Sequence, residues 1–299
     1  MFYLPKPNFS IINTYPICVE LVTDDNIRTY LQNLSQDIFS YALEYEYLGQ
    51  NKRLNELLKY AKFSPEIDDR NKWLLNLYNY YFAKSTNERS TLAHGYYKRL
   101  FSYETDRAVR RCCYCNANKI DALDHFLPES KYHALSVNPM NLVPACEHCN
   151  KKKKAYEPNP NDSRSVLIHP YYDNILNLPW LKVSLTPEVI KGIKRVRTNY
   201  YINHQVFMDD EVLYGRISTT LKNIKLNDNI CHIADDFVNT EVIPDFVDGE
   251  YAEKSEVDLR MLFSKKADRL RQQGYGLNHW KVAIYSYLST HPGNYDSLY

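Results

Sequence analysis

Residues 112–154 read CCYCNANKIDALDHFLPESKYHALSVNPMNLVPACEHCNKKKK, and this segment carries the most specific pattern in the chain. It contains two Cys-x-x-Cys pairs, Cys112/Cys115 and Cys146/Cys149, with thirty residues between them. Such pairs are typical of structural zinc, because each tight turn points two thiolates at one metal centre. Disulfides and rubredoxin-type iron are the alternatives. We expect zinc, because nothing in the chain indicates secretion and cytosolic thiols stay reduced.

Four sulfurs would close the coordination shell of this metal, so any chemistry must come from other residues. Between the cysteine pairs lies Asp124-His125, in the run Ala122–Pro128. This run predicts a short strand that ends in a loop. A histidine at a strand end can act as a general base near neutral pH. The preceding aspartate points to the opposite face of the strand, where it could bind a hard cation.

Residues 112–154 resemble the HNH nuclease family in its zinc-stapled form: CxxC, then DH-apolar-x-P, then N-L-V-P-x-C-x-x-C-N and a lysine cluster. The resemblance implies a two-stranded hairpin plus a helix, the ββα-metal fold, which cuts phosphodiesters with one divalent cation. It also implies site roles. Asp124 matches the metal ligand, His125 the base that activates water, and Asn141 the residue that braces the loop orienting the histidine.

The sequence departs from the family at the third of the residues that give the family its name. Asn150 stands where the eponymous members have a second histidine, as in the H-N-N variants. An amide oxygen suits Mg²⁺ or Mn²⁺ and is a poor zinc ligand, so the resemblance implies a magnesium or manganese site on Asp124 and Asn150. His148 is an alternative ligand, although we expect it to face solvent. Compact HNH proteins with helical flanks also resemble effectors of bacterial anti-phage systems, including the Septu type, where the nuclease works beside an ATPase.

The composition describes a globular protein: 299 residues, 44% of them hydrophobic and 24% charged. No apolar run is long enough to span a bilayer, so we expect no membrane association and a cytoplasmic location. The formal net charge of +1 does not indicate nucleic-acid binding. Such binding must come from local patches. We expect phosphate contacts from two basic clusters: Arg110, Arg111, Lys151, Lys152, Lys153 and Lys154. We also expect the four lysines to start a helix, where backbone N–H groups attract phosphate.

The predicted fold is mostly α with a small embedded α+β module, a central ββα-metal, zinc-stapled nuclease core wrapped by N- and C-terminal helices. The predicted regions are 1–105, helical; 106–175, the HNH module; and 176–299, α+β and helical. Within the first region, alternation in residues 1–22 predicts an extended arm or edge strand, followed by helices from about Thr23 to Thr105. In the third region, residues 181–193 predict a strand pair around a Thr186-Pro187 turn, residues 199–207 a further strand, and residues from Glu211 onward helices.

Two further residues have structural interpretations. Cys113 lies inside the first cysteine turn without ligating, although a Cys113-x-Cys115 pair is an alternative. We expect His169 to be a buried, hydrogen-bonded structural histidine.

The predicted function is a metal-dependent HNH endonuclease acting on nucleic acid, DNA favoured, with a partner ATPase implied by the resemblance alone. The alternative is a non-catalytic zinc module that binds nucleic acid or a protein partner and has no use for the Asp-His pair.

Overall fold

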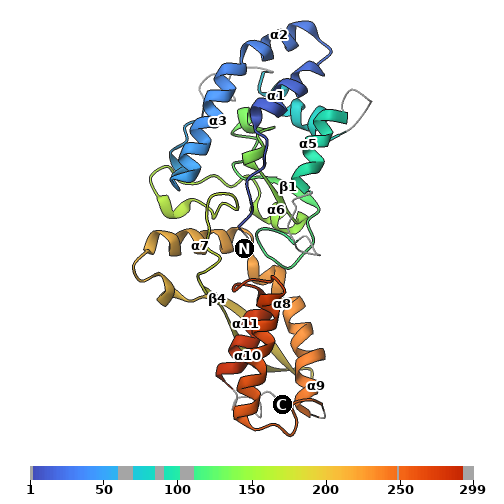
Figure 1. The fold of residues 1–299 in the computed structure, drawn as a ribbon, viewed down its shortest axis with the longest axis vertical. Coiled ribbons are helices and arrows are strands. Elements are labelled where there is room, and N and C mark those ends of the chain that lie inside the picture. The colour runs from blue at the N-terminus through green and yellow to red at the C-terminus, as the bar shows by residue number, and fades with distance from the viewer. Residues whose placement is uncertain (1–2, 60–69, 85–90, 102–110, 248, 292–299) are drawn as a thin grey trace.

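The computed structural model describes residues 3–59, 70–84, 91–101, 111–247 and 249–291, and this part of the chain is mostly helical with two small antiparallel sheets. Figure 1 shows an elongated molecule with the N-terminal helices at one end and the C-terminal helices at the other. Strand β1 and helix α6 lie between them. None of the described helices is long and apolar enough to cross a membrane.

The N-terminal end consists of five described helices, one π-helical segment and a 3₁₀ turn. They are α1 (Ile11–Glu20), α2 (Asp25–Asn33), α3 (Ser35–Gln50), η1 (Leu54–Glu56), α4 (Arg70–Asn76), η3 (Leu77–Phe82, π-helical) and α5 (Thr91–Phe101). The helical spacing predicted after Thr23 is confirmed in α2, α3, α4 and α5. Residues 60–69, 85–90 and 102–110 of the same predicted region lie outside the described residues.

Helix α1 corrects one prediction, because residues 1–22 had indicated an extended arm or edge strand. The Asn13 side chain accepts a hydrogen bond from the Ser10 backbone N–H at 2.9 Å, which starts the helix. The buried positions then follow helical spacing: Ile11, Thr14, Tyr15, Cys18 and Val19. A short run of apolar residues suits either a strand or a buried helix, and here packing decides for the helix.

The central unit is a short hairpin followed by a helix. Strand β1 (Ala122–His125) pairs antiparallel with β2 (Leu142–Ala145), so that Ala122 faces Ala145 and His125 faces Leu142. Two 3₁₀ turns, η5 (His133–Leu135) and η6 (Pro139–Asn141), lie in the connection, and α6 (Glu147–Lys153) follows β2. The predicted strand at residues 122–128 is therefore confirmed, and it ends at His125.

The N-terminal helices bind the connection between β1 and β2 through buried hydrogen bonds. The Thr14 hydroxyl of α1 donates to the Val137 carbonyl at 2.7 Å. The Ser136 hydroxyl donates to the Leu74 carbonyl of α4 at 2.8 Å. Buried backbone groups need such partners, so these helices fix the position of the connection as well as covering it.

The C-terminal end contains a long hairpin and a set of helices. Its elements are η7 (Ser163–Ser165), β3 (Leu181–Ile190), β4 (Ile193–Ile202), η8 (His204–Phe207), α7 (Glu211–Asn223), α8 (Leu226–Phe237), η9 (Val238–Val242, π-helical), α9 (Ile243–Val247), α10 (Glu256–Gln272) and α11 (Trp280–Thr290).

The turn of this hairpin corrects a second prediction. Strand β3 runs through Thr186 and Pro187, and the chain reverses at Lys191-Gly192. Both turn residues have positive φ, 51° and 79°, as a two-residue type I′ turn requires. A glycine at the second position favours that conformation, whereas Pro187 is tolerated because both strands of a two-stranded sheet are edge strands.

A buried polar cluster joins α7 to the loop before β3. The Arg216 guanidinium donates to both carboxylate oxygens of Asp173, at 2.9 and 2.6 Å. Asp173 also accepts from the His169 backbone N–H at 2.7 Å. The Tyr171 backbone N–H donates to His169 Nδ1, so Nε2 carries the proton and donates to the Tyr45 hydroxyl at 2.9 Å. His169 is therefore the expected buried, hydrogen-bonded histidine.

Burial holds the pKa of His169 well below its usual value, and the Arg216 charge lowers it further. The unfolded chain then binds a proton near pH 6.5 that the folded chain does not bind. The free energy of unfolding therefore keeps its full value above that pH. Below it, the free energy of unfolding falls by up to about 1.4 kcal/mol per pH unit. Between about pH 7.5 and pH 5.5, we expect the free energy of unfolding of His169→Gln to fall by about 1.4 kcal/mol less than that of the wild type. The measurement is unfolding in urea at each pH. The exposed His232→Gln should retain the wild-type dependence, and an equal dependence in His169→Gln would contradict this assignment.

Candidate functional site

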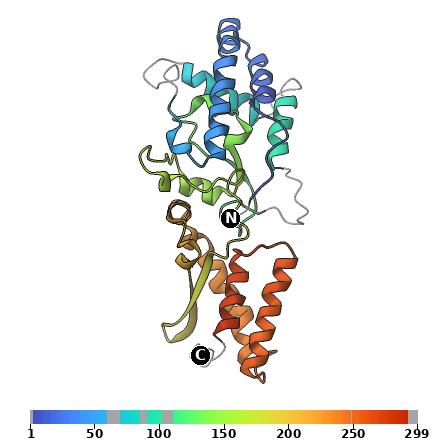
Figure 2. The ribbon, with the colours of Figure 1, turned by 60° about the vertical axis from the view of Figure 1, so that its left-hand side comes forward.

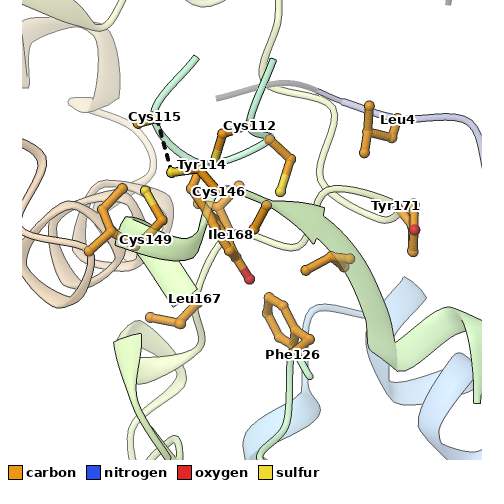
Figure 3. Packing of buried hydrophobic residues seen from close by; sticks show 14 of the residues in the cluster. Leu4, Cys112, Tyr114, Cys115, Phe126, Cys146, Cys149, Leu167, Ile168 and Tyr171 are labelled. Carbon is orange, nitrogen blue, oxygen red and sulfur yellow. Dashed lines mark hydrogen bonds between the residues drawn. The ribbon is translucent and has the colours of Figure 1, made fainter. Parts of the chain in front are cut away.

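Four buried cysteines form a cluster around one point, as Figure 3 shows. They are Cys112, Cys115, Cys146 and Cys149, and their sulfur atoms all lie within 4.8 Å of one another. The Cys115 and Cys146 sulfurs are 3.9 Å apart. Tetrahedral zinc with Zn–S bonds near 2.3 Å needs a sulfur separation of about 3.8 Å. A disulfide needs about 2.05 Å, and all seven cysteines of the chain are free. The donor set and spacing fit a zinc ion.

The hairpin register brings the two cysteine pairs together. Ala122 faces Ala145, so the turn before β1 and the residues after β2 lie at the same end of the hairpin. Cys146 is the N-cap of α6, and Cys149 lies in its first turn. Cys113 is buried outside the cluster, with its backbone N–H directed at the Pro144 carbonyl. The alternative Cys113-x-Cys115 ligand pair is therefore wrong.

An asparagine from the C-terminal end completes the surroundings of the cluster. The Asn229 amide of α8 donates to the Cys149 sulfur at 3.3 Å and accepts from the Asn118 amide at 2.8 Å. N–H donors stabilise negative charge on sulfur, so Asn229 supports a metal-bound thiolate. Sequence reasoning missed this residue, because a lone asparagine inside an amphipathic helix has no distinguishing pattern.

Asp124 is buried beside the cluster and already has a cationic partner. One carboxylate oxygen lies 3.0 Å from the Lys153 ammonium, and the other accepts from the Tyr114 hydroxyl at 2.6 Å. Lys153 also donates to the His125 carbonyl at 2.9 Å. Burial raises the pKa of Asp124, while Lys153 and Tyr114 oppose that rise. Among the described residues, Asn150 makes no hydrogen bond to Asp124, so the partner present in the structure is Lys153.

His125 is held in one orientation by backbone and aromatic contacts. Its Nε2 lies 2.9 Å from the Ser136 carbonyl and 3.5 Å from a Glu129 carboxylate oxygen. A carbonyl can only accept, so Nε2 carries a proton, and the neutral tautomer with this proton has its lone pair on Nδ1. The Tyr78 ring of η3 packs against it, edge to face, with centroids 4.5 Å apart. The His125 side chain is 10% exposed.

Asn141 joins the two ends of the connection between the strands. Its side-chain amide donates to the Leu127 carbonyl at 3.0 Å and accepts from the Leu127 N–H at 2.8 Å. Its own carbonyl accepts from the Phe126 N–H at 2.7 Å. These contacts fix the two residues that follow His125, and therefore the path of the backbone that carries the histidine.

The start of α6 corrects a third prediction. The sequence had indicated that Asn150 and the lysines start a helix, but α6 begins at Glu147, because the second cysteine turn is itself the first helical turn. The lysines therefore lie in the last turn, where cations are favoured by the helix dipole. The N–H groups at the start of α6, which favour phosphate, are therefore not beside these lysines.

The basic residues divide into exposed, buried and undescribed positions. Lys151 is exposed and pairs with Glu147 at 2.8 Å, Lys152 is half-buried and Lys154 is exposed. Lys153 is buried against Asp124 and is not available to a phosphate, which corrects its predicted role. For this one lysine of the run, the ion pair with the buried Asp124 replaces contact with water.

The first basic cluster is only partly described. The half-buried Arg111 donates to the Ala117 carbonyl at 2.9 Å, and its guanidinium lies 5.2 Å from the centre of the Tyr275 ring. Arg110 lies outside the described residues. The phosphate contacts of Arg110, Arg111, Lys151, Lys152 and Lys154 remain predictions.

Comparison with known proteins finds partial similarity to two of them. A segment of 133 residues is 27% identical to the Septu protein PtuB of Bacillus thuringiensis, covering 42% of this chain and 48% of that protein. A segment of 64 residues is 39% identical to protein ea31 of Escherichia phage lambda, covering 21% of each. The chain thus spans about half of PtuB and about a fifth of ea31. No protein-family profile and no solved structure matches the chain.

We expect the purified protein to contain one zinc ion per chain, measured by elemental analysis. Cys149→Ser should lose most of the zinc and much of the stability, because a structural zinc contributes directly to folding. Cys113→Ser is the matched control, since Cys113 is equally buried but lies outside the cluster. Iron in place of zinc, or loss of zinc from Cys113→Ser but not from Cys149→Ser, would contradict the assignment.

Proposed function

We propose that this protein is a metal-dependent HNH endonuclease that hydrolyses phosphodiester bonds of nucleic acid, with DNA favoured over RNA. The observation that carries the proposal is the fixed tautomer of His125. Its Nε2–H donates to the Ser136 carbonyl, which leaves a basic Nδ1 directly after a buried carboxylate on β1. A base that makes the nucleophile needs this kind of positioned lone pair.

In this mechanism, Nδ1 of His125 accepts a proton from the water that attacks the phosphorus in line. Asn141 holds the backbone after His125, and Tyr78 limits the motion of the ring. Asp124 and Asn150 would hold Mg²⁺ or Mn²⁺, which would stabilise charge on the phosphorane and on the leaving 3′ oxygen. The products would carry 5′-phosphate and 3′-hydroxyl ends, as the resemblance implies.

The site suits a hard cation only in part. Magnesium uses one or two carboxylates and completes its shell with waters and substrate phosphates, so Asp124 can serve as its protein anchor. Within the described ranges, the cysteine cluster is the one group of three or more His, Cys, Asp or Glu side chains placed to hold a metal. A divalent cation at Asp124 would also compete with the Lys153 ammonium, 3.0 Å away.

That same contact favours a second candidate function, a zinc module that binds nucleic acid or a protein partner without catalysis. With Lys153 as its permanent partner, Asp124 would be a structural residue that holds α6 against β1. The two candidates make different claims about one oxygen atom of Asp124: in the nuclease it must exchange an ammonium for a divalent cation.

The similarity to the Septu protein PtuB supports a role in anti-phage defence. We extend the proposal accordingly: the chain acts as the nucleic-acid-cleaving effector of such a system. A partner ATPase is part of the proposal because the resemblance to Septu-type effectors implies one.

The base assignment is tested with His125→Ala. We expect cleavage to fall by at least about 10²–10⁴-fold, because the water loses its proton acceptor. The assay measures cleavage of plasmid, single-stranded DNA and RNA with and without Mg²⁺ or Mn²⁺. Zinc content should stay at the wild-type value, and the exposed His232→Ala should cut normally. Wild-type cleavage by His125→Ala would refute the assignment.

The identity of the cation at Asp124 is tested with Lys153→Met. This change leaves a buried carboxylate without its partner, so we expect the free energy of unfolding to fall by about 3–5 kcal/mol. If Asp124 binds a divalent cation, millimolar Mn²⁺ should stabilise Lys153→Met more than the wild type, because its competitor is gone. The measurement is chemical unfolding with and without Mn²⁺.

The control for this test is the double variant Lys153→Met, Asp124→Asn, which keeps the shape of the site but removes its charge. It should show no Mn²⁺-dependent stabilisation. The same small response in the single and double variants would favour the non-catalytic zinc module.

A further inference from the structure

The β3–β4 hairpin has two halves that differ in burial. In the half near Leu181, alternate residues such as Val183, Leu185 and Tyr200 are buried, and α8 and α11 pack on these strands. Beyond Leu185 and Val196 the alternation ends. We call residues 186–195 the distal hairpin. It exposes 65% of Val189, 57% of Ile193 and 37% of Ile190. Figure 2 shows the two strands to one side of the C-terminal helices.

The hairpin concentrates positive charge. Residues 181–202 carry five cationic side chains and one carboxylate, a net charge of +4 against +1 for the whole chain. The carboxylate, Glu188, pairs with Arg197, which also pairs with Asp235. The other cations make no ion pair with any acidic residue in the part of the chain that the structure describes: Lys182, Lys191, Lys194 and Arg195.

The turn places one of these cations at the outermost point of the hairpin. Lys191 occupies the first position of the type I′ turn with φ 51°, where asparagine, aspartate or glycine is preferred. A lysine accepts this left-handed conformation only with strain. A Cβ atom at Gly192 would meet nothing within 4 Å, so the described protein leaves open space beside this residue. The residue preference of the turn does not explain the lysine.

Cationic and apolar groups lie on both faces of the distal hairpin. Cross-strand partners share a face, so the pairs Ile190–Ile193 and Glu188–Arg195 lie on one face. The pair Val189–Lys194 lies on the other. A flat protein partner covers one face of a sheet, whereas the walls of a groove surround both.

We propose that the distal hairpin inserts into the major groove of double-stranded DNA. That groove, about 12 Å wide, admits a two-stranded β-ribbon, while the major groove of A-form RNA is too narrow for side chains to read. Lys191, Lys194 and Arg195 contact the phosphates that line the groove, and the exposed aliphatic side chains contact thymine methyl groups. The inference rests on the proposed function only in taking nucleic acid as the partner. It adds duplex DNA as the form bound and a contact separate from the residues around His125.

The test measures binding of a DNA duplex of about 30 base pairs by fluorescence anisotropy over a range of salt concentrations, in a His125→Ala background that prevents cleavage. The variant changes Lys191, Lys194 and Arg195 to Gln. Because three cations no longer neutralise phosphates, the slope of log K against log salt should fall by about 2.7, and affinity near 0.15 M salt should fall about 100-fold. The matched control changes Lys254, Arg260 and Lys265 to Gln. These side chains are also exposed and without ion pairs among the described residues, and binding should not change.

A second variant, Ile190→Ser with Ile193→Ser, separates apolar from ionic contact. It should weaken duplex binding about tenfold while leaving the salt slope unchanged. Because these side chains are exposed, the fold should survive, as circular dichroism would show.

The outcomes distinguish this inference from the proposed function. An unchanged slope in the triple variant overturns the inference, as does a parent protein that binds no duplex DNA. Equal losses on duplex RNA or single-stranded DNA overturn the major-groove assignment, and so does a loss confined to binding of a protein partner. If the protein with His125 intact never cuts nucleic acid while the triple variant still loses duplex binding, the inference stands and the endonuclease proposal fails.

Discussion

The meeting of four cysteine sulfurs at one point is the constraint on which the rest of the central unit depends. A hairpin with four residues per strand buries too little surface to be stable alone. The cluster ties the turn before β1 to the first turn of α6, and so fixes the helix against the hairpin. That placement brings Lys153 to Asp124, and the N-terminal helices then hold the connection that carries Ser136, the partner of His125.

The buried Asp124–Lys153 pair gives this small unit a polar centre. Desolvating two charges costs several kcal/mol each, and their attraction offsets this only when further hydrogen bonds satisfy them. Such hydrogen bonds are present here, because the Tyr114 hydroxyl donates to Asp124 and Lys153 donates to the His125 carbonyl. A structural pair needs nothing more. The nuclease proposal requires more, because a divalent cation would have to displace the Lys153 ammonium from Asp124.

Sequence reasoning succeeded where the signal is local. The cysteine spacing, the strand ending at His125 and the helices after Thr23 depend on residues close in the chain. It failed where distant packing decides: residues 11–20 form a helix, β3 passes through Pro187, and Lys153 turns inward. Each of these depends on neighbours that a single sequence does not reveal. The Septu-like anti-phage resemblance, which rests on the motifs alone, agrees with the partial similarity to PtuB.

The hydrogen bond from Asn229 to the Cys149 sulfur spans 80 positions of the chain. Through it, α8 supplies an N–H donor to one sulfur atom of the cluster. Asn227, Asp235 and Asn239 of the same helical stretch also hold the outer edge of β4. Separate hydrogen bonds from one helical stretch therefore reach the cluster and the long hairpin. The cluster and the long hairpin therefore share one support, because the same helical stretch donates to a sulfur atom and accepts hydrogen bonds from the edge of β4.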